Sequence, residues 1–312
     1  MQTGATAQFR QDIADALMEN ALGAGQFIGD KVFPILPVGV KNGIFAKVAF
    51  AETQTSAVDD KRGSSGNYNE VTHEATTDTF NCQKRGLIEA VDDDDAITLG
   101  RYFDAELAAA NFVRYYLMLN REARQAAIAF SLTVMSGFTT AATVAWSTPA
   151  TAEPVSDVEK AKNKIVDSLN GMVGDGSKII GIGNNTARQQ LRATADIKDR
   201  VYAGGNVQAG QVSEQQLAQI LGLDEVHFSG LKRSGTDIWN TGRFGIFIVS
   251  ESMQIKSVPH FGRTMLWRDS TPTDMMVDTY RDENRESNIV RVKHNTVEKL
   301  LTARAGHLIT GI

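Results

Sequence analysis

Several residue types are scarce in this sequence, and each scarcity excludes a class of protein. The 312 residues include one cysteine, Cys82, so no disulfide forms within the chain, and a reducing compartment suits it. Six prolines exclude a collagenous or proline-rich composition. No run of eighteen apolar residues occurs, so we expect no membrane partner. The N-terminal MQTGATAQFRQD lacks the charged and apolar regions of a signal peptide.

Positive charge is also in short supply. The chain has 32 Lys and Arg against 37 Asp and Glu, a net charge of −5, which argues against a protein that grips duplex DNA. Residues 59–95 contain four basic and ten acidic side chains and so account for more than the whole excess. This segment is either a solvated loop or, as we hypothesise, a projecting arm that docks on a less acidic surface of another chain.

The N-terminal third contains the signals of an extended arm and a long hairpin. Residues 8–22 have the apolar spacing of a short helix, and Pro34 and Pro37 keep 30–38 extended. The strand IFAKVAF (44–50) and its return TDTFNCQKRGLIEAV (77–91) flank a polar, glycine-rich tip at 59–70. A two-stranded ribbon of that length needs a surface to lie on.

One long helix is predicted from about residue 104 to residue 130. Apolar side chains recur there at spacings of three and four, which predicts a buried stripe. The stripe consists of Phe112, Tyr116, Leu119, Ala123, Ala126 and Phe130. At about 1.5 Å per residue, the helix forms a rod of roughly 40 Å, the length of a scaffold element.

The middle of the chain has an α/β pattern, and a β segment follows Pro272. Ser156 with Glu159, and Ser213 with Gln216, have the spacing of capping boxes. The first predicted helix carries Val158, Ala161, Ile165 and Leu169 on its apolar face. Strands are predicted at SKIIGIG (177–183), EVHFSG, FGIFIVS and around 290–295, and helices at NNTARQQLRA (184–193) and SEQQLAQILGL, which Gly222 ends.

Motifs that carry chemistry are nearly absent, so the sequence predicts no enzyme, cofactor or metal. GMVGDGSK (171–178) lacks the Gly-Lys-Ser/Thr order of a phosphate loop, and GIGNNT (181–186) lacks the third glycine of a dinucleotide fingerprint. The tetrad Asp92–Asp95 is a solvated, helix-capping run rather than a cation site. The five histidines show no zinc spacing.

The order of elements resembles that of tailed-phage major capsid proteins with the Hong Kong 97-like fold, an α+β fold. This order is arm, acidic hairpin, long helix, α/β unit and closing β segment. The resemblance covers nearly the whole chain, and the following stretches carry it: DKVFPILPV, TFNCQKRGLIEAVDDDD, W-S-T-P with SDVEKAKNKI (146–165), GIGNNTARQQLRATADIKDRV, SEQQLAQILGLDEV and RDENRESNIVRVKHNTVEKLLTARAGHLI.

The resemblance implies a division of the chain. It makes 1–35 an N-arm, 36–91 the extended E-loop, 92–148 with 256–312 a peripheral domain containing the spine helix, and 149–255 an axial domain. It also implies a virion protein made in the cytoplasm of a bacterial host. Such a subunit forms hexamers and pentamers of an icosahedral shell around double-stranded DNA, without sequence recognition.

Other partners follow from the same resemblance. The short arm implies a separate scaffolding protein, a portal is expected, and a decoration protein stays open. Some relatives join an E-loop lysine to a neighbour's asparagine; Lys61 lies at such a tip, but no pattern assigns its partner, so we assign no cross-link. Two alternatives stay open: an encapsulin-like compartment shell, and a small-molecule-binding α/β enzyme built on 156–231.

The predicted contacts between subunits combine apolar and charged residues. The arm and hairpin carry apolar side chains that a single subunit would not bury well, and the acidic hairpin would meet basic side chains of a neighbour. The candidate contact residues are Phe33, Ile35, Phe45, Phe50, Asp59, Asp60, Lys61, Arg62, Arg114, Arg121, Arg124, Arg281 and Arg285.

Overall fold

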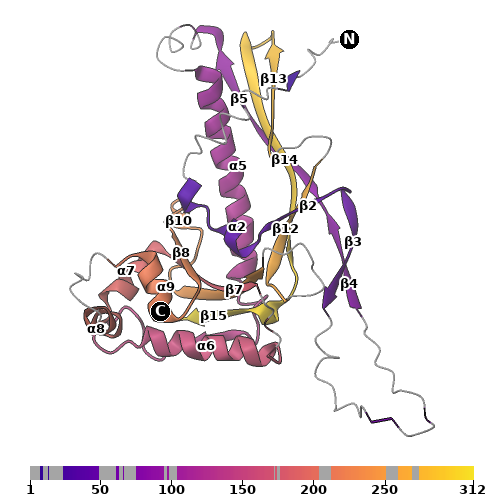
Figure 1. Cartoon of the computed structure of the whole chain (residues 1–312). Coiled ribbons are helices and arrows are strands. Elements are labelled where there is room, and N and C mark those ends of the chain that lie inside the picture. The colour runs from indigo at the N-terminus through magenta and orange to yellow at the C-terminus, as the bar shows by residue number, and fades with distance from the viewer. Residues whose placement is uncertain are drawn as a thin grey trace.

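A long helix, two sheets and a projecting hairpin make up the computed structural model (Figure 1). It describes residues 8–9, 13, 24–48, 61–62, 66, 75–94, 97, 104–171, 173, 176–203, 212–250, 259–268 and 274–312. Most of the predicted helix 8–22 lies outside these ranges, but Gln8–Phe9 form strand β1, so the helix does not begin there. No helix among the described residues is long and apolar enough to cross a membrane.

The first sheet has six strands in the order β1-β13-β14-β12-β2, and β5 pairs with the other edge of β14. β14 is antiparallel to β5, β13 and β12, whereas β2 is parallel to β12. The strands are β2 (Ile35–Val38), β5 (Gln83–Asp92), β12 (Gly262–Trp267), β13 (Met276–Asp282) and β14 (Ser287–Leu300). The strand predicted around 290–295 is confirmed as part of β14, in which Val290, Val292 and His294 are buried, but Asn295, expected on the opposite side from them, is buried as well.

The second sheet has five strands in the order β6-β15-β11-β7-β8. The strands are β6 (Thr139–Ala141), β7 (Ser177–Asn184), β8 (Glu225–Ser229), β11 (Arg243–Ser250) and β15 (Gly306–Thr310). The associated helices are α6 (Pro154–Ser168), α7 (Asn185–Ala193), α8 (Ala195–Ala203), α9 (Glu214–Leu221) and the 3-10 turn η3 (Ala303–Ala305). The largest hydrophobic core lies between this sheet and its helices.

Two members of this sheet come from stretches that the resemblance assigns to the peripheral domain. β6 and β15 were expected in the peripheral domain, but both hydrogen-bond into the five-stranded sheet. The reason is the apolar sequence of β15: Leu308 and Ile309 are buried in the same core as Phe244 and Ile246 of β11. The chain therefore returns to the second sheet at its C-terminal end.

The helices beside the second sheet have different N-terminal caps, and one predicted cap is not formed. Asn184 caps α7, and Ser213 with Gln216 forms the predicted capping box of α9, which ends at Gly222 with φ 62°. The predicted box at Ser156 and Glu159 is wrong, because Pro154 occupies the first turn and α6 begins two residues earlier. The predicted apolar face of α6 is confirmed by its burial.

The long helix α5 (Ala105–Ala129) begins after Asp104, whose carboxylate accepts a hydrogen bond from the Leu107 N–H at 3.1 Å. Its position is confirmed, but half of its predicted buried stripe is wrong. Phe112 and Tyr116 are 50% and 44% exposed. Small side chains face the sheet instead, because they let the helix lie close to β5 and β14: Ala109, Ala110 and Val113 pack with Leu117 against Val290 and Val292.

The arm and the hairpin join this framework on one side (Figure 1). A 3-10 turn η1 (Ala24–Gln26) and α2 (Gly29–Val32) precede β2. The predicted hairpin is formed by β3 (Asn42–Val48) and β4 (Ala75–Asn81), which pair from Asn42↔Asn81 to Val48↔Ala75. A second short hairpin, β9 (Lys232–Arg233) with β10 (Thr236–Asp237), lies beside α5.

The return strand of the hairpin is shorter than predicted. The stretch 77–91 breaks at Cys82, whose backbone N–H donates to the Lys41 carbonyl at 2.8 Å. β5 then leaves the hairpin and pairs with β14 over ten residues. The second half of the predicted E-loop strand is therefore part of the six-stranded sheet, because β14 offers it a longer ladder than β3 does.

Candidate intersubunit surfaces

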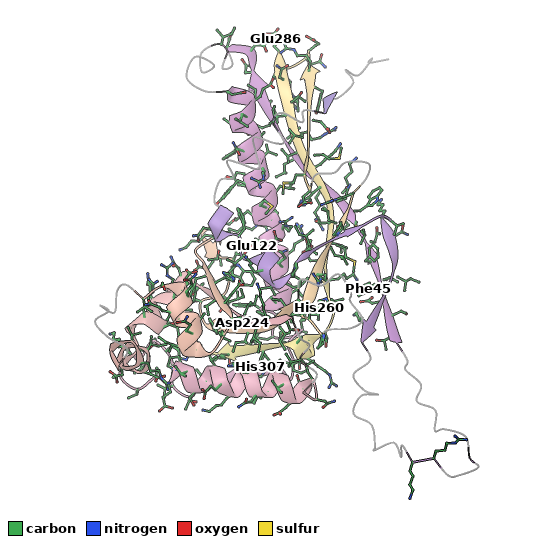
Figure 2. All side chains as sticks on the ribbon, viewed as in Figure 1. Phe45, Glu122, Asp224, His260, Glu286 and His307 are labelled. Carbon is green, nitrogen blue, oxygen red and sulfur yellow. The ribbon has the colours of Figure 1, made fainter. Side chains whose placement is uncertain are left out.

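The hairpin β3–β4 has one covered face and one bare face. Phe45 and Phe80 point to the body of the subunit, with ring centroids 6.4 Å apart, and are buried with Cys82 and Met265 (Figure 2). On the opposite face Ile44 is 71% exposed. Alternation along a strand places these neighbours on opposite faces. The hairpin is thus anchored by its inner face and offers its outer face to another molecule.

Charges on the hairpin are paired across its strands. Lys47 Nζ lies 2.7 Å from the Asp78 carboxylate, and this hydrogen bond lowers the pKa of Asp78. Further along, Lys61 and Arg62 are exposed, and Arg62 Nε donates to the Gly66 carbonyl at 2.7 Å. Phe50, Asp59 and Asp60 lie outside the described residues, so their contact role stays a prediction.

Two apolar residues of the predicted contact set are buried by the subunit itself. Phe33 is fully buried, and its ring meets Phe261 edge to face at 5.6 Å. Phe45 packs on Phe80 as described. The expectation that a single subunit could not cover these two side chains is wrong, because Phe261 covers Phe33 and the cluster of Phe80, Cys82 and Met265 covers Phe45. Ile35, on β2, is half-buried.

The basic side chains of α5 are engaged within the subunit as well. Arg121 pairs with Asp30 of the arm, and Arg124 forms two hydrogen bonds of 2.9 Å with Glu298 of β14. Arg114 is half-buried; burial lowers its pKa, and the nearby Arg121 adds to the effect. Arg121 and Arg124 thus tie the helix to the arm and the sheet, and their role in contacts between subunits stays a prediction.

At the far end of the six-stranded sheet, part of the acidic segment meets its partner in the same chain. Arg281 binds Asp93 with contacts of 2.5 and 2.7 Å, which lower the pKa of Asp93 and raise that of Arg281. Arg285, by contrast, is 64% exposed and lies 3.6 Å from Asp282. Of these two candidates, Arg285 keeps the exposure that a contact with a neighbour needs.

Exposed apolar side chains lie on α5 and β5, where the sequence did not predict them. Phe112 and Tyr116 form a T-shaped pair with centroids 4.8 Å apart. Ile88, on β5, is 52% exposed and has Leu87 beside it. β5 is an edge strand within the described sheet, and exposed edges and apolar faces are typical of interaction surfaces. The signal was available in the aromatic spacing of α5, but periodicity alone cannot tell which face a sheet covers.

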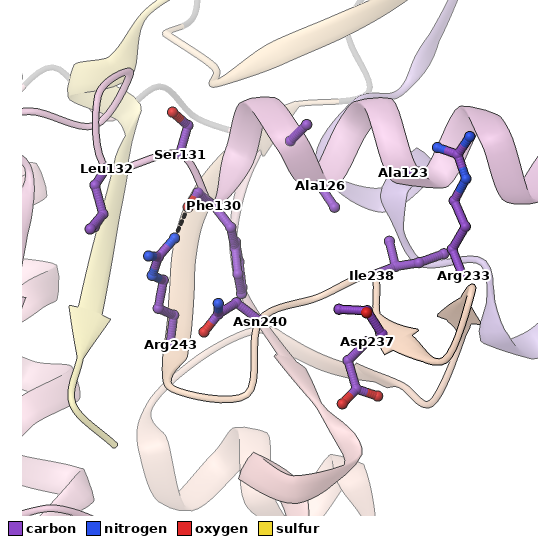
Figure 3. A pocket seen from close by; sticks show the side chains of 12 residues that line it. Ala123, Ala126, Phe130, Ser131, Leu132, Arg233, Asp237, Ile238, Asn240 and Arg243 are labelled. Carbon is purple, nitrogen blue, oxygen red and sulfur yellow. Dashed lines mark hydrogen bonds between the residues drawn. The ribbon is translucent and has the colours of Figure 1, made fainter.

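A groove of about 570 Å³ lies between the C-terminal half of α5 and the β9–β10 hairpin (Figure 3). Small apolar side chains from α5 line it, among them Ala123 and Ala126. Its polar residues are engaged at the rim: Arg243 donates to the Phe130 carbonyl, and Asp237 lies 3.9 Å from Lys232. The groove has the character of a packing surface rather than of a reaction centre.

One buried carboxyl group stands in the middle of α5. Glu122, labelled in Figure 2, accepts hydrogen bonds from the backbone N–H groups of Ile28 and Gly29 and from the indole N–H of Trp239. Sequence reasoning missed it, because a glutamate inside an apolar stripe gives no sign of its partners. Within the described residues, no group of three His, Cys, Asp or Glu gathers that could hold a metal ion.

A covered hairpin base, a bare hairpin face and a rod helix across two sheets define the class of fold used by phage capsid proteins. Comparison with solved structures places this chain in it. A phage-related protein from Bordetella bronchiseptica RB50 is similar with a TM-score of 0.70 and 19% identity over 97% of both chains. The capsid of the cyanophage P-SCSP1u is similar with a TM-score of 0.61 and 11% identity over 89% of this chain and 86% of that one.

A third solved structure, from the Mycobacterium phage Adephagia, is similar with a TM-score of 0.58 and 14% identity over 98% of both chains. No family model matches the sequence, and no curated protein matches it. The chain has the α+β phage major capsid protein fold, as the sequence resemblance predicts.

Proposed function

We propose that this chain is a major capsid protein that assembles into the icosahedral head shell of a tailed phage. The observation that carries the proposal is the hairpin β3–β4, which projects from the subunit with Ile44 almost bare. The fold shared with the cyanophage capsid supports the same proposal. A projecting ribbon that exposes an isoleucine is costly in a monomer and useful in a shell, where the next subunit covers it.

The surfaces that meet in the shell differ from each other, so each contact is heterologous. Hairpin, α5 face and β5 edge lie on separate parts of the subunit, and such contacts close into rings when the rotation fits, here hexamers and pentamers. Covering one large apolar side chain such as Ile44 contributes about 1.5–3 kcal/mol. Repetition over every subunit makes this small contribution decisive.

The proposal includes the following partners and location. A separate scaffolding protein guides assembly, a portal occupies one vertex, and the shell is made in the host cytoplasm and becomes part of the virion. Whether a decoration protein also binds stays open. The subunit is non-enzymatic. With a net charge of −5 it encloses double-stranded DNA without sequence recognition. Sub-micromolar duplex affinity at physiological salt in a filter-binding titration would contradict this.

The proposal is tested by assembly of the purified protein, followed by sedimentation and electron microscopy. We expect closed particles from the wild type in the presence of its scaffolding protein. Ile44→Asn should reduce particle yield at least tenfold while leaving the unfolding midpoint of the subunit unchanged. The matched control is Val166→Asn, because Val166 is an exposed apolar residue on α6. A wild-type chain that stays monomeric under these conditions would refute the proposed function.

A further inference from the structure

The carboxyl group of Glu122 joins three separate parts of the chain. It is buried on α5, and it accepts from Ile28 N at 3.0 Å, from Gly29 N at 2.9 Å and from Trp239 Nε1 at 2.7 Å. The arm and the Trp239 loop are therefore held to the helix through one side chain. A buried carboxylate of this kind requires either full pairing or a proton.

A second oxygen atom lies beside this carboxyl group with no donor among the described residues. It is Oε1 of Gln125, one turn further along α5. The orientation of the amide is fixed, because Nε2 donates to Asp30 Oδ1 at 2.9 Å and to Thr264 Oγ1 at 3.1 Å. Flipping the amide would place its oxygen against Asp30. The amide of Gln125 therefore keeps this orientation, with Oε1 unpaired.

Gly29 shows how close the two oxygen atoms are. A Cβ on Gly29 would lie 2.7 Å from Glu122 Oε2 and closer still to Gln125 Oε1. The two oxygens are therefore at most twice 2.7 Å apart. One water molecule can bridge two oxygens at the upper end of that range, and a proton is shared directly where they lie within about 3 Å.

We propose that Glu122 carries a proton on Oε2, that this proton is shared with the amide oxygen of Gln125, and that the arm and the Trp239 loop are thus closed onto α5 by a neutral carboxylic acid. A proton on Oε2 supplies the donor that Gln125 Oε1 lacks. The other oxygen, Oε1, keeps its bonds from Ile28, Gly29 and Trp239, and the Gly29 N–H, which also lies 2.9 Å from Oε2, is satisfied by Oε1 alone. The arrangement satisfies every polar atom of the junction, which an ionised carboxylate does not.

The surrounding charges favour the same protonation state. Burial raises the pKa of Glu122 to about 7, the charge of Asp30 adds to this, and the N–H donors oppose it. Asp30 is the charged side chain that acts on Glu122, and it is itself paired with Arg121 of α5. On the neighbouring elements, Lys31 of α2 is exposed to solvent, and Asp237, before the Trp239 loop, pairs with Lys232. None of these places a cation on Glu122 itself among the described contacts.

The consequence for stability has a definite sign. Because the pKa is higher in the folded chain than the ordinary glutamate value of 4.5, the folded chain holds the proton more tightly than the unfolded chain. Stability is therefore greatest at low pH with respect to this group and is lost as the pH rises through 7. Between pH 6 and pH 8, Glu122 alone should raise the unfolding equilibrium constant about tenfold.

The test compares the full-length wild type with Glu122→Gln in urea titrations from pH 6 to pH 8. Glutamine keeps an acceptor for the three N–H groups and offers an N–H to Gln125. Buried histidines are common to both proteins, so the ratio of the wild-type to the variant unfolding constant should rise about tenfold between pH 6 and pH 8. Glu283→Gln, at an exposed position, is the control and should match the wild type. Equal pH dependence in wild type and Glu122→Gln would overturn the proposal, as would a dependence on the identity of the salt cation, which would place a cation between the oxygens.

A second variant keeps the proposal testable if Glu122→Gln fails to fold. Trp239→Phe removes one donor that stabilises the ionised form. It should shift the midpoint of the pH dependence upward, whatever its effect on overall stability. A midpoint that is unchanged or moves to lower pH contradicts the shared proton.

Discussion

Position 29 has no room for a side chain, and this has a measurable consequence. The added methyl group of Gly29→Ala would push into side-chain oxygens of Glu122 and Gln125, and both side chains are held by hydrogen bonds, Glu122 through its carboxylate oxygens and Gln125 through its amide nitrogen. We expect a loss of about 1–3 kcal/mol in the free energy of unfolding, measured by urea denaturation. Gly39→Ala is the control, because nothing lies within 4 Å of its added Cβ; an equal loss there would refute the explanation.

A buried histidine gives a pH dependence of the opposite sign. His294, on β14, has no hydrogen-bond partner for either ring nitrogen in the described structure. Burial, followed by the charges of Arg121, Arg124 and Arg85, lowers its pKa from 6.5 to about 3. Stability is therefore complete above pH 6.5 and is lost as the pH falls towards 3.

The matching variant is His294→Gln, which is neutral at every pH. Compared with pH 7.5, the wild type should lose about 2 kcal/mol more than the variant at pH 5. Urea titrations at the two pH values measure this difference, and the contribution of Glu122 cancels because both proteins contain it. Equal losses would mean that His294 is protonated in the folded chain.

Residue-level features were predictable where they depend on neighbours in sequence. The capping box at Ser213 and the turn at Gly222 are local, and both were predicted correctly. The box at Ser156 was local too, but Pro154 competes for the same helix start. Glu122 and His294 were not predictable, because their partners lie on other elements and the sequence records no spacing for them.

Contacts between elements decide which arginines stabilise the subunit and which remain available to a neighbour. Removing Arg124 leaves Glu298, whose side chain is only 5% exposed, without its bidentate partner. We expect Arg124→Met to lower the free energy of unfolding by about 2–3 kcal/mol. Arg285→Met should change it by less than about 0.5 kcal/mol, because that side chain is exposed. If both substitutions changed the free energy of unfolding equally, the ion pair of Arg124 with Glu298 would not be what stabilises the subunit.

At the scale of elements, type and position were more predictable than orientation. The limits of α5 follow from Asp104 and the apolar periodicity, and the structure confirms them. Which face of α5 is buried depends on the sheet, and the sheet selected small side chains over Phe112 and Tyr116. For the same reason the sequence placed β5 in the hairpin. Its alternation would suit pairing with β3 or with β14, and in the structure it pairs with β14.

For the whole molecule, the acidic segment 59–95 yields a prediction about assembly. Replacing Asp59 and Asp60 by Lys raises its net charge from −6 to −2. If the segment clamps a neighbour, assembly monitored by light scattering should weaken at low salt, and the difference should vanish near 1 M salt, where the Debye length is about 3 Å. Asp167→Lys with Asp199→Lys, both exposed on helices of the second sheet, is the control. If the double variant assembles like the wild type at every salt concentration, the hypothesis that segment 59–95 clamps a neighbour is wrong.

Element order was sufficient to predict the fold of the whole molecule, but the sequence did not give the boundaries inside it. The hairpin, rod helix and α/β unit occur in the predicted order. β6 and β15 crossed the expected boundary because the pairing partners of a strand are set by contacts between residues far apart in the chain. Hydrophobic periodicity depends on residues close together in the sequence, so it cannot predict these long-range contacts.

The single thiol of the chain has a practical consequence for mapping the shell. Cys82 is fully buried beneath the hairpin, and burial raises its pKa, so the thiolate needed for alkylation or oxidation is both inaccessible and disfavoured. A cysteine introduced at position 44 would therefore be the one reactive sulfur in the folded wild-type background. Maleimide labelling of Ile44→Cys before and after assembly then reads directly whether a neighbouring subunit shields the hairpin, without a cysteine-free parent protein.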